Sequence, residues 1–430
     1  MSWIKGTSSD YIDLSNDIVA AVTATSLDTV AIDGTDASTG YVAGDILTIA
    51  GGTGTAATIE VVSVDGGGAL TAVRIDSAGV YSAGPSTPNS PTGGTGSGAA
   101  LAITSSTNGW TADRDTTWSG TERDVILHGT GGGSDTIYVG WRTYNVGASG
   151  RYNWELHGYT GYDSGLANQS QPGASPGAHD SGDAATRKGT YLLLKNGSMN
   201  WWLSVTPFRI ILMVRVDSNF YPMYLGFISR YATTTEYPYP LMVAGAAPEY
   251  DATHNQATTF SSLTDPWAEV NVDDGPMRLI DAAGTWHSFA NATFTGADIN
   301  PSGKYITLPC GSLQDSSSAP LEDRFTAHSL AFSFDHIVNM DTISAPTANL
   351  EPTPGTGADY YVLFPTMLLH SETANDQQVY GELDDVFWFQ AYSTTTAPTS
   401  EDRIIQGDVY RVFKNCNRTG IHSFLAIKEG

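Results

Sequence analysis

Histidine is the side chain most often used for acid–base chemistry and metal binding near neutral pH, and the sequence contains nine. No two histidines lie two or four positions apart, and no His-Glu-x-x-His motif occurs. The segment His179-Asp-Ser-Gly-Asp183 carries several ligand atoms, but Asp, Ser and Gly in succession are more typical of a turn. Cys310 and Cys416 lie 106 positions apart, which fits neither a metal motif nor a disulfide framework. These patterns predict no metal centre.

Carboxylates are the most numerous potential ligands, and they are densest in Asn271-Val-Asp-Asp-Gly275 and Gly381-Glu-Leu-Asp-Asp385. Either group could bind Ca²⁺, although neither matches the twelve-residue calcium loop and a solvated turn is the simpler interpretation. A pair of carboxylates could also serve a glycosidase. With 45 acidic residues in the chain, however, nearness in sequence identifies no such pair. We therefore expect a protein that is not an enzyme, with no catalytic residues and no cofactor.

An internal repeat occupies the first quarter of the chain. Leu27–Asp33 returns as Leu70–Asp76 at an offset of 43 residues, and Gly51–Val61 returns as Gly93–Ile103 at an offset of 42. Both units contain a turn with a tyrosine and a Gly-Gly-Thr-Gly turn. No Lys-Ser/Thr follows either glycine turn, so a phosphate-binding loop is not indicated. The repeat predicts a Gly-rich two-repeat β domain over residues 23–107.

Composition predicts an all-β fold in two parts. The chain has 46 Gly and only 15% charged residues, which suits short strands joined by turns better than long helices. Residues 1–109 hold one of the ten Trp, so the composition of the chain changes near residue 109. We therefore expect a short N-terminal segment at 1–22 and the repeat domain at 23–107. A larger aromatic-rich β-sandwich-like region, with room for two subdomains, is expected at 110–430. A short helical turn is expected near Ser9–Ala20. Alternating patterns predict strands at 59–64, 70–75, 135–144, 152–159, 208–216, 221–227, 326–334, 360–364, 386–392, 407–413 and 422–427.

Charge and hydropathy exclude two classes of partner. The net charge of −25 and the pI near 4.4 make a nucleic-acid binder very unfavourable, because such a surface repels phosphates. No apolar run approaches the ~18 residues that a membrane span needs, so no membrane insertion is expected. The first residues lack a basic region followed by an apolar one, which predicts synthesis in the cytoplasm.

Two long polar loops, at 158–190 and 232–274, carry aromatic residues that favour contacts with partners. Tyr237-Pro-Tyr-Pro240 is the strongest candidate, since its prolines exclude a central strand and leave two tyrosines on a stiff segment. The same aromatic clusters also fit core packing or a sugar-stacking surface. Two arginines beside these clusters are expected to pair with carboxylates. The candidate interface residues are Tyr162, Tyr237, Tyr239, Tyr250, Arg142 and Arg230.

Several segments of the larger region resemble a family of tailed-bacteriophage virion structural proteins. The resemblance covers most of residues 120–430, and the repeat unit at 27–103 is similar to β modules inserted in other phage structural proteins. The segments that carry it are Asp135–Tyr144, Tyr152–Tyr162, Tyr224–Phe227, Tyr231–Leu241, Gly407–Phe413 and Arg418–Gly420.

This resemblance implies a place in a virion and no catalytic residues. It leads us to expect a non-enzymatic, tail-associated component, such as a baseplate, collar or fibre protein, made in the host cytoplasm. Its partners would be copies of itself in a symmetric oligomer and other virion proteins. The alternative is a carbohydrate-binding or depolymerising receptor-binding protein, for which a host surface glycan would be the partner.

Overall fold

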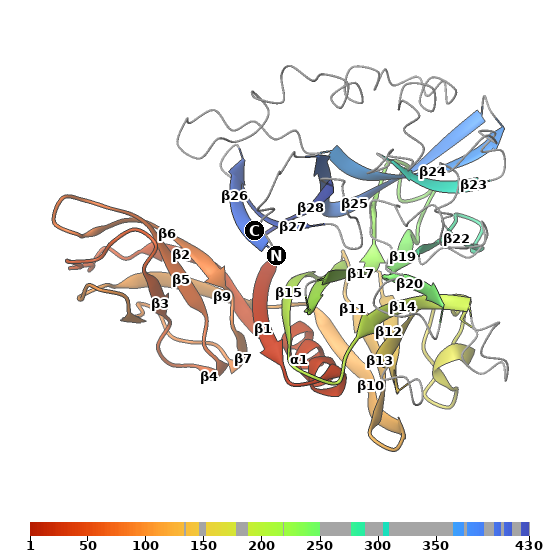
Figure 1. Ribbon diagram of the computed structural model, residues 1–430, viewed down its shortest axis with the longest axis horizontal. Coiled ribbons are helices and arrows are strands. Elements are labelled where there is room, and N and C mark those ends of the chain that lie inside the picture. The colour runs from red at the N-terminus through yellow and green to blue at the C-terminus, as the bar shows by residue number, and fades with distance from the viewer. Residues whose placement is uncertain are drawn as a thin grey trace.

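The computed structural model describes residues 1–132, 135–145, 152–177, 188–217, 219–249, 277–288, 304–308, 364–373, 376–390, 400–405, 408–414 and 423–429. Antiparallel strands in five sheets make up most of this part of the chain, so the predicted all-β fold is confirmed. One α-helix accompanies them, α1 (Tyr11–Thr23), and no helix in the described ranges is long and apolar enough to span a membrane. Figure 1 shows an arm of two small sheets projecting from a larger body.

Seven strands form the first sheet of the body, and the chain begins in it. β1 pairs with β15 along its whole length, from Ser2 opposite Val205 to Ser8 opposite Met199. Residues 1–22 are therefore part of the body rather than a separate segment. In order across the sheet, the strands are β1 (Ser2–Ser8), β15 (Met199–Thr206), β16 (Arg209–Val216), β17 (Asn219–Phe227), β19 (Leu241–Ala244), β21 (Met277–Ile280) and β22 (Trp286–Ser288).

Six strands form the second body sheet. Strands predicted at 135–144 and 152–159 are present in it as β12 and β13. The predicted loop 232–274 is wrong in part, because the apolar run Leu241–Ala244 is a buried strand, β19, and a further strand, β20, follows it. The order is β10 (Trp110–Ser119), β11 (Glu122–Gly129), β12 (Ile137–Asn145), β13 (Tyr152–Tyr159), β14 (Lys188–Leu194) and β20 (Ala247–Glu249).

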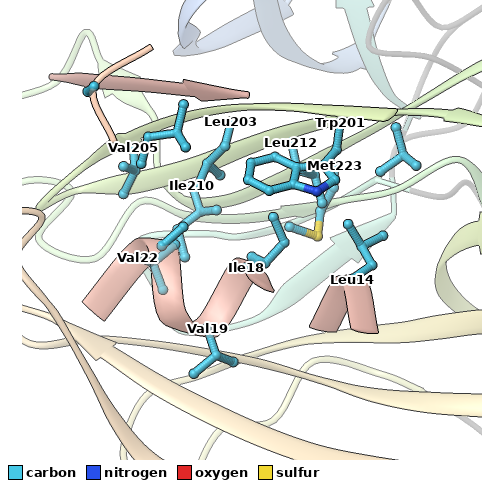
Figure 2. Close-up of a cluster of buried hydrophobic side chains, with 14 of the residues drawn as sticks. Leu14, Ile18, Val19, Val22, Trp201, Leu203, Val205, Ile210, Leu212 and Met223 are labelled. Atoms are coloured by element: carbon cyan, nitrogen blue, oxygen red, sulfur yellow. The ribbon is translucent and has the colours of Figure 1, made fainter. Parts of the chain in front are cut away.

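Helix α1 fills the space between the two body sheets. The Asp10 carboxylate caps it by accepting hydrogen bonds of 2.8 Å from two backbone N–H groups of the first turn. Leu14, Ile18 and Val22 point toward the first sheet, whereas Val19 points to the other side (Figure 2). The side chains that receive them from the first sheet include Trp201, Leu203, Val205, Ile210, Leu212 and Met223.

Two tryptophans of the second sheet hold the other side of α1. Trp141 and Trp154 stack nearly parallel, with ring centroids 5.1 Å apart. The Trp141 indole donates to the Ser15 hydroxyl at 2.8 Å, and the Trp154 indole donates to the Tyr11 carbonyl at 3.0 Å. The expected helical turn near Ser9–Ala20 is thus a full helix, stabilised by packing on both faces.

The arm consists of two four-stranded sheets inserted in the chain between α1 and β10. All of its strands lie between Thr25 and Thr107. One sheet has the order β4 (Thr53–Thr55), β7 (Val80–Ala83), β2 (Thr25–Ile32) and β9 (Leu101–Thr107). The other has the order β6 (Leu70–Ser77), β5 (Thr58–Val64), β3 (Ile46–Thr48) and β8 (Thr92–Gly93).

Strand pairing in the arm repeats with the offsets seen in the sequence. The last strand of each repeat pairs with the first strand of the other, β5 with β6 and β9 with β2. Equivalent residues face each other in both pairs, which makes the arm pseudo-twofold. The matching pairs are Ile59–Ile75 with Leu101–Ile32, and Val61–Val73 with Ile103–Val30.

Each Gly-Gly-Thr-Gly turn leaves room for the ring of a tyrosine that belongs to the other repeat. A Cβ on Gly52 would lie 2.8 Å from the Tyr81 ring, and a Cβ on Gly96 would lie 2.5 Å from the Tyr41 ring. Glycine is needed at both positions because the ring occupies the space of a side chain.

A third sheet of the body is built from the C-terminal part of the chain. The predicted hairpin at 407–413 and 422–427 is confirmed as β27 and β28. The predicted strand at 326–334 lies outside the described residues. The order is β23 (Lys304–Leu308), β24 (Phe364–Thr373), β25 (Asp376–Gln390), β28 (Ser423–Lys428), β27 (Asp408–Lys414) and β26 (Ser400–Ile405), and β18 (Ser229–Arg230) pairs with β25.

Candidate functional site

A row of polar side chains crosses the second body sheet. The register places Asp124 of β11 opposite Arg142 of β12, Arg142 opposite Glu155 of β13, and Glu155 opposite Tyr191 of β14. Facing residues of neighbouring strands point to the same side of a sheet, so these four side chains form one transverse row. None is more than 7% exposed. The row brings together an arginine and two carboxylates, the residue types of an acid–base site.

Asp124 is held by several neighbouring side chains. Its carboxylate lies 3.5 Å from the Arg142 guanidinium and 3.4 Å from that of Arg114. The Asn168 side-chain amide donates to it at 2.6 Å and in turn accepts a hydrogen bond from the Tyr159 hydroxyl. Two cations and an amide thus satisfy one buried carboxylate, as burial of a charge requires.

Electrostatics fix the protonation of the arginine and the phenols in this cluster. Burial alone would lower the pKa of Arg142, but Asp124 and Tyr144 outweigh it and the pKa is raised. Burial raises the pKa of the Tyr144 hydroxyl far above its ordinary value, and Glu155 adds to the rise. Burial and then Asp124 do the same for Tyr159. At neutral pH the arginine is therefore charged, and both phenols are hydrogen-bond donors.

The loop that follows β13, described for residues 160–177, covers the row of polar side chains at Glu155. Tyr144 donates to the Glu155 carboxylate at 3.2 Å, and His157, fully buried, has its Nε2 atom 3.5 Å from the other carboxylate oxygen. The backbone of Gly177 lies so close that a Cβ there would be 2.6 Å from Glu155 Oε1 and 2.7 Å from the His157 ring. No substrate fits between loop and sheet at this point. The cluster therefore fastens the loop to the sheet.

The same loop contains Gly173-Ala-Ser-Pro-Gly177, which has the Gly-x-Ser-x-Gly spacing of a hydrolase nucleophile. The spacing makes Ser175 a candidate nucleophile. In hydrolases, however, this motif forms a strand-to-helix turn, whereas here it lies between the strands β13 and β14. The Ser175 hydroxyl accepts a hydrogen bond from the Gly158 N–H at 3.1 Å. The ring nitrogens of His157 have no hydrogen-bond partner among the described residues, so no serine–histidine pair is formed.

The acidic group at 381–385 binds an arginine. Arg209, whose side chain is fully buried, donates to Asp384 at 2.8 Å and also to Asp385. Its guanidinium additionally lies 3.2 Å from the Ser204 hydroxyl. The interpretation of this group as a solvated turn is wrong, because both aspartates lie in β25, where they join the first and third body sheets. The other acidic group, at 271–275, lies outside the described residues, and the described residues contain no cluster of three or more metal-ligating side chains.

Tyr237 and Tyr239 are packed inside the chain. Tyr237 is 2% exposed, donates to the Ile280 carbonyl and contacts Tyr380 edge-on with ring centroids 5.7 Å apart. Tyr239 donates to the Tyr159 carbonyl at 2.7 Å. Neighbouring strands therefore supply the partners that both hydroxyl groups need, and the assignment of these two tyrosines to a subunit interface stays a prediction.

The other predicted interface residues have separate positions. Tyr162 is half-buried, with the Arg114 guanidinium 5.7 Å above its ring and its hydroxyl 3.2 Å from the Asp113 carbonyl. Arg142 pairs with a carboxylate as expected, but inside the sheet. Among the described residues, Arg230 donates to the carbonyls of residues 237 and 238 rather than to a carboxylate. Tyr250 lies outside the described residues.

Comparison with known proteins finds no family model and no curated protein that matches this chain. The resemblance to phage virion proteins therefore remains a prediction from motifs. Inferences about function have to be argued from the geometry described above together with the sequence.

Proposed function

We propose that the chain is a non-enzymatic structural component of a bacteriophage virion, associated with the tail as a baseplate, collar or fibre protein. It assembles through symmetric contacts with its own copies and binds other virion proteins. The motif resemblance supplies this assignment, and the turn-rich sheets and the projecting arm suit a subunit that meets several neighbours (Figure 1).

The observation that carries the proposal is the use of the aromatic residues. A sugar-binding face needs exposed flat rings beside polar groups, whereas a structural subunit spends its rings on packing. Among the described residues, only Phe208 and Tyr231 are largely exposed aromatic side chains. The rings of Trp141, Trp154 and Tyr224 are fully buried.

The main polar clusters support the same proposal. In the second body sheet Asp124 is held by two arginines, and the aspartates of β25 are held by Arg209. Both sets of contacts are used to join elements of the fold.

Purified particles of the source phage test this proposal. We expect mass spectrometry to find the chain in them at a fixed copy number that matches a rotational symmetry of the tail. Its absence from purified particles would refute the structural role. A fluorophosphonate probe, with Ser175→Ala as the control, tests the non-enzymatic part: labelling that disappears in the variant would identify a serine hydrolase.

One observation favours glycan binding as a second candidate function. The Tyr231 side chain is 55% exposed, and its hydroxyl donates to the Glu382 carboxylate at 2.7 Å. An exposed ring beside a carboxylate can stack on a sugar and accept its hydroxyls. Binding of host-surface polysaccharide by the purified chain, lost in Tyr231→Ala and kept in Phe208→Ala, would support this function, and equal binding by both variants would exclude this site.

A further inference from the structure

An apolar patch lies on the outer face of the arm. It consists of Val42, Ile46 and Val62, whose side chains are 52%, 43% and 39% exposed. Ile46 and Val62 come from the neighbouring strands β3 and β5, on the face opposite to the buried Val61. The turn that carries Val42 is joined to β5 by a hydrogen bond of 2.8 Å from the Gly44 N–H to the Val61 carbonyl. Val42, Ile46 and Val62 thus come from adjoining segments of one sheet, and Glu60, which pairs with Arg74, lies opposite Ile46.

The other repeat of the arm has polar residues at the positions that correspond in sequence. The 42-residue offset places Val62 at the position of Thr104, and the residue after each conserved tyrosine of the repeat is Val42 in one unit and Ser82 in the other. Thr104 and Ser82 are exposed and polar. The backbone differs at both positions, because Val62 lies at a bulge of β5 whereas Thr104 is paired with Thr29, and Ser82 lies in β7 whereas Val42 lies outside the strands. Both valine side chains are exposed, so packing within the arm gives no reason for an apolar residue there. Exposed apolar groups of this kind mark contact surfaces.

Charge decides what can bind the patch. The arm, residues 23–107, has seven acidic residues and one basic residue, Arg74, so its net charge is −6. Hydrogen bonds from hydroxyl and backbone N–H groups lower the pKa of Asp33, Asp45 and Asp65, which therefore remain ionised. A second copy of the chain would bring another strongly negative surface. The complementary occupant is a different protein with a basic contact surface.

We propose that the patch docks a second virion protein whose contact surface has an apolar centre framed by Lys or Arg side chains. Three side chains cannot supply the ~800 Å² that each partner of a stable complex buries. The patch is therefore the dry centre of a larger contact, and the acidic groups of the arm form its rim. This inference rests on the proposed function, because it requires that the chain is part of a particle.

Site-specific photo-crosslinking in particles tests the inference. The photoreactive residue benzoylphenylalanine replaces Val62 in one chain and Thr104, its symmetry equivalent, in the matched control. We expect ultraviolet light to join position 62 to a peptide of a different, Lys/Arg-rich virion protein, with no such product from position 104. A product with the chain itself, no product, or equal products from both positions would overturn the inference. Absence of the unmodified chain from particles would instead refute the proposed function.

A substitution test avoids the bulky probe. Val42→Ser with Val62→Thr changes two exposed side chains, so the fold is expected to be kept. Incorporation into particles should fall about tenfold. Complete burial of one exposed valine side chain raises the association constant by a factor of about ten or more, and burial at the patch is only partial. Thr104→Ser, the control, should be incorporated normally. Normal incorporation of the double variant, with a circular dichroism spectrum like that of the parent, would contradict a role for the patch.

Discussion

Replacing Arg142 with Met is expected to lower the free energy of unfolding of the body by about 3 kcal/mol. Removing one partner of a buried ion pair typically costs ~3–5 kcal/mol, because the other charge is left in a poorly solvated place. The lower end applies here, since Asp124 keeps the Arg114 guanidinium at 3.4 Å and the Asn168 amide at 2.6 Å. Met preserves most of the side-chain length, so the effect is mainly electrostatic.

A double-mutant cycle separates this pair from simple packing. Asp124→Asn removes the charge and keeps the shape, so the double variant should be more stable than the sum of the two single changes implies, by about 2 kcal/mol. Urea unfolding followed by tryptophan fluorescence measures the body, because no Trp lies in residues 23–107. Arg123→Met is the matched control within the body: Arg123 of β11 pairs with Asp115, but the two side chains are 20% and 32% exposed, and a loss below about 1 kcal/mol is expected.

Two results would contradict an energetic role for the buried pair of Asp124 and Arg142. A coupling below about 0.5 kcal/mol would mean that Asp124 and Arg142 contribute independently. Equal losses for Arg142→Met and Arg123→Met would mean that burial of the row has no energetic consequence.

Three further outcomes follow from the structure. Tyr237→Ala and Tyr239→Ala should each destabilise the body by about 3 kcal/mol, with Phe at the same positions costing about 1 kcal/mol; unchanged thermal melting would contradict their burial. Asp10→Ala should cost about 1 kcal/mol through loss of the α1 cap, and no shift in thermal melting would mean that packing alone sets the helix start. The pKa of Asp65 is lowered in the folded arm by backbone hydrogen bonds, so its stabilisation is present above about pH 4 and lost as the pH falls through the folded value. The protection of arm amides, taken relative to the intrinsic exchange rate at each pH, should therefore fall less at pH 3 in Asp65→Asn than in the parent, and identical changes would exclude this carboxylate.

Many of the strands could be predicted from the local alternation of apolar and polar residues. In Tyr152–Tyr159 the residues at 152, 154 and 156 were expected to share one face, and Trp154 and Leu156 are indeed buried in the core that surrounds α1. The opposite face holds Glu155 and His157, and the same alternation could have identified it as a polar row. The pseudo-twofold similarity of the arm could likewise be predicted from the sequence, because the segments repeat at offsets of 42 and 43 residues.

Long-range pairing could not be predicted in the same way. Arg142 was expected to meet a carboxylate, but its choice of Asp124 depends on the register between β11 and β12, which no local pattern gives. Tyr237 looked exposed because the prolines around it prevent a regular strand. Its burial comes from Ile280 and Tyr380, which are distant in sequence.

The seam between arm and body shows how a turn-like sequence can be a rigid joint. The cluster Thr104–Gly109 has the composition of a linker, yet Asn108 within it is buried. Its side-chain amide donates to the Ala21 carbonyl at 2.7 Å and to the Ser26 hydroxyl at 3.0 Å, and its carbonyl oxygen accepts from the Ser2 hydroxyl at 2.7 Å. One side chain thus ties the entry and exit of the arm to the first strand of the body.

A second tie lies further along the arm, where Lys5 of β1 contacts Asp76 of β6 at 2.5 Å. A joint held at two places, one of them buried, restricts rotation of the arm more than a Gly-Ser linker would. The patch of Val42, Ile46 and Val62 is therefore presented in a defined direction from the body. Such fixed geometry lowers the entropy lost when identical subunits each bind the same partner, which is what a symmetric particle requires of its parts.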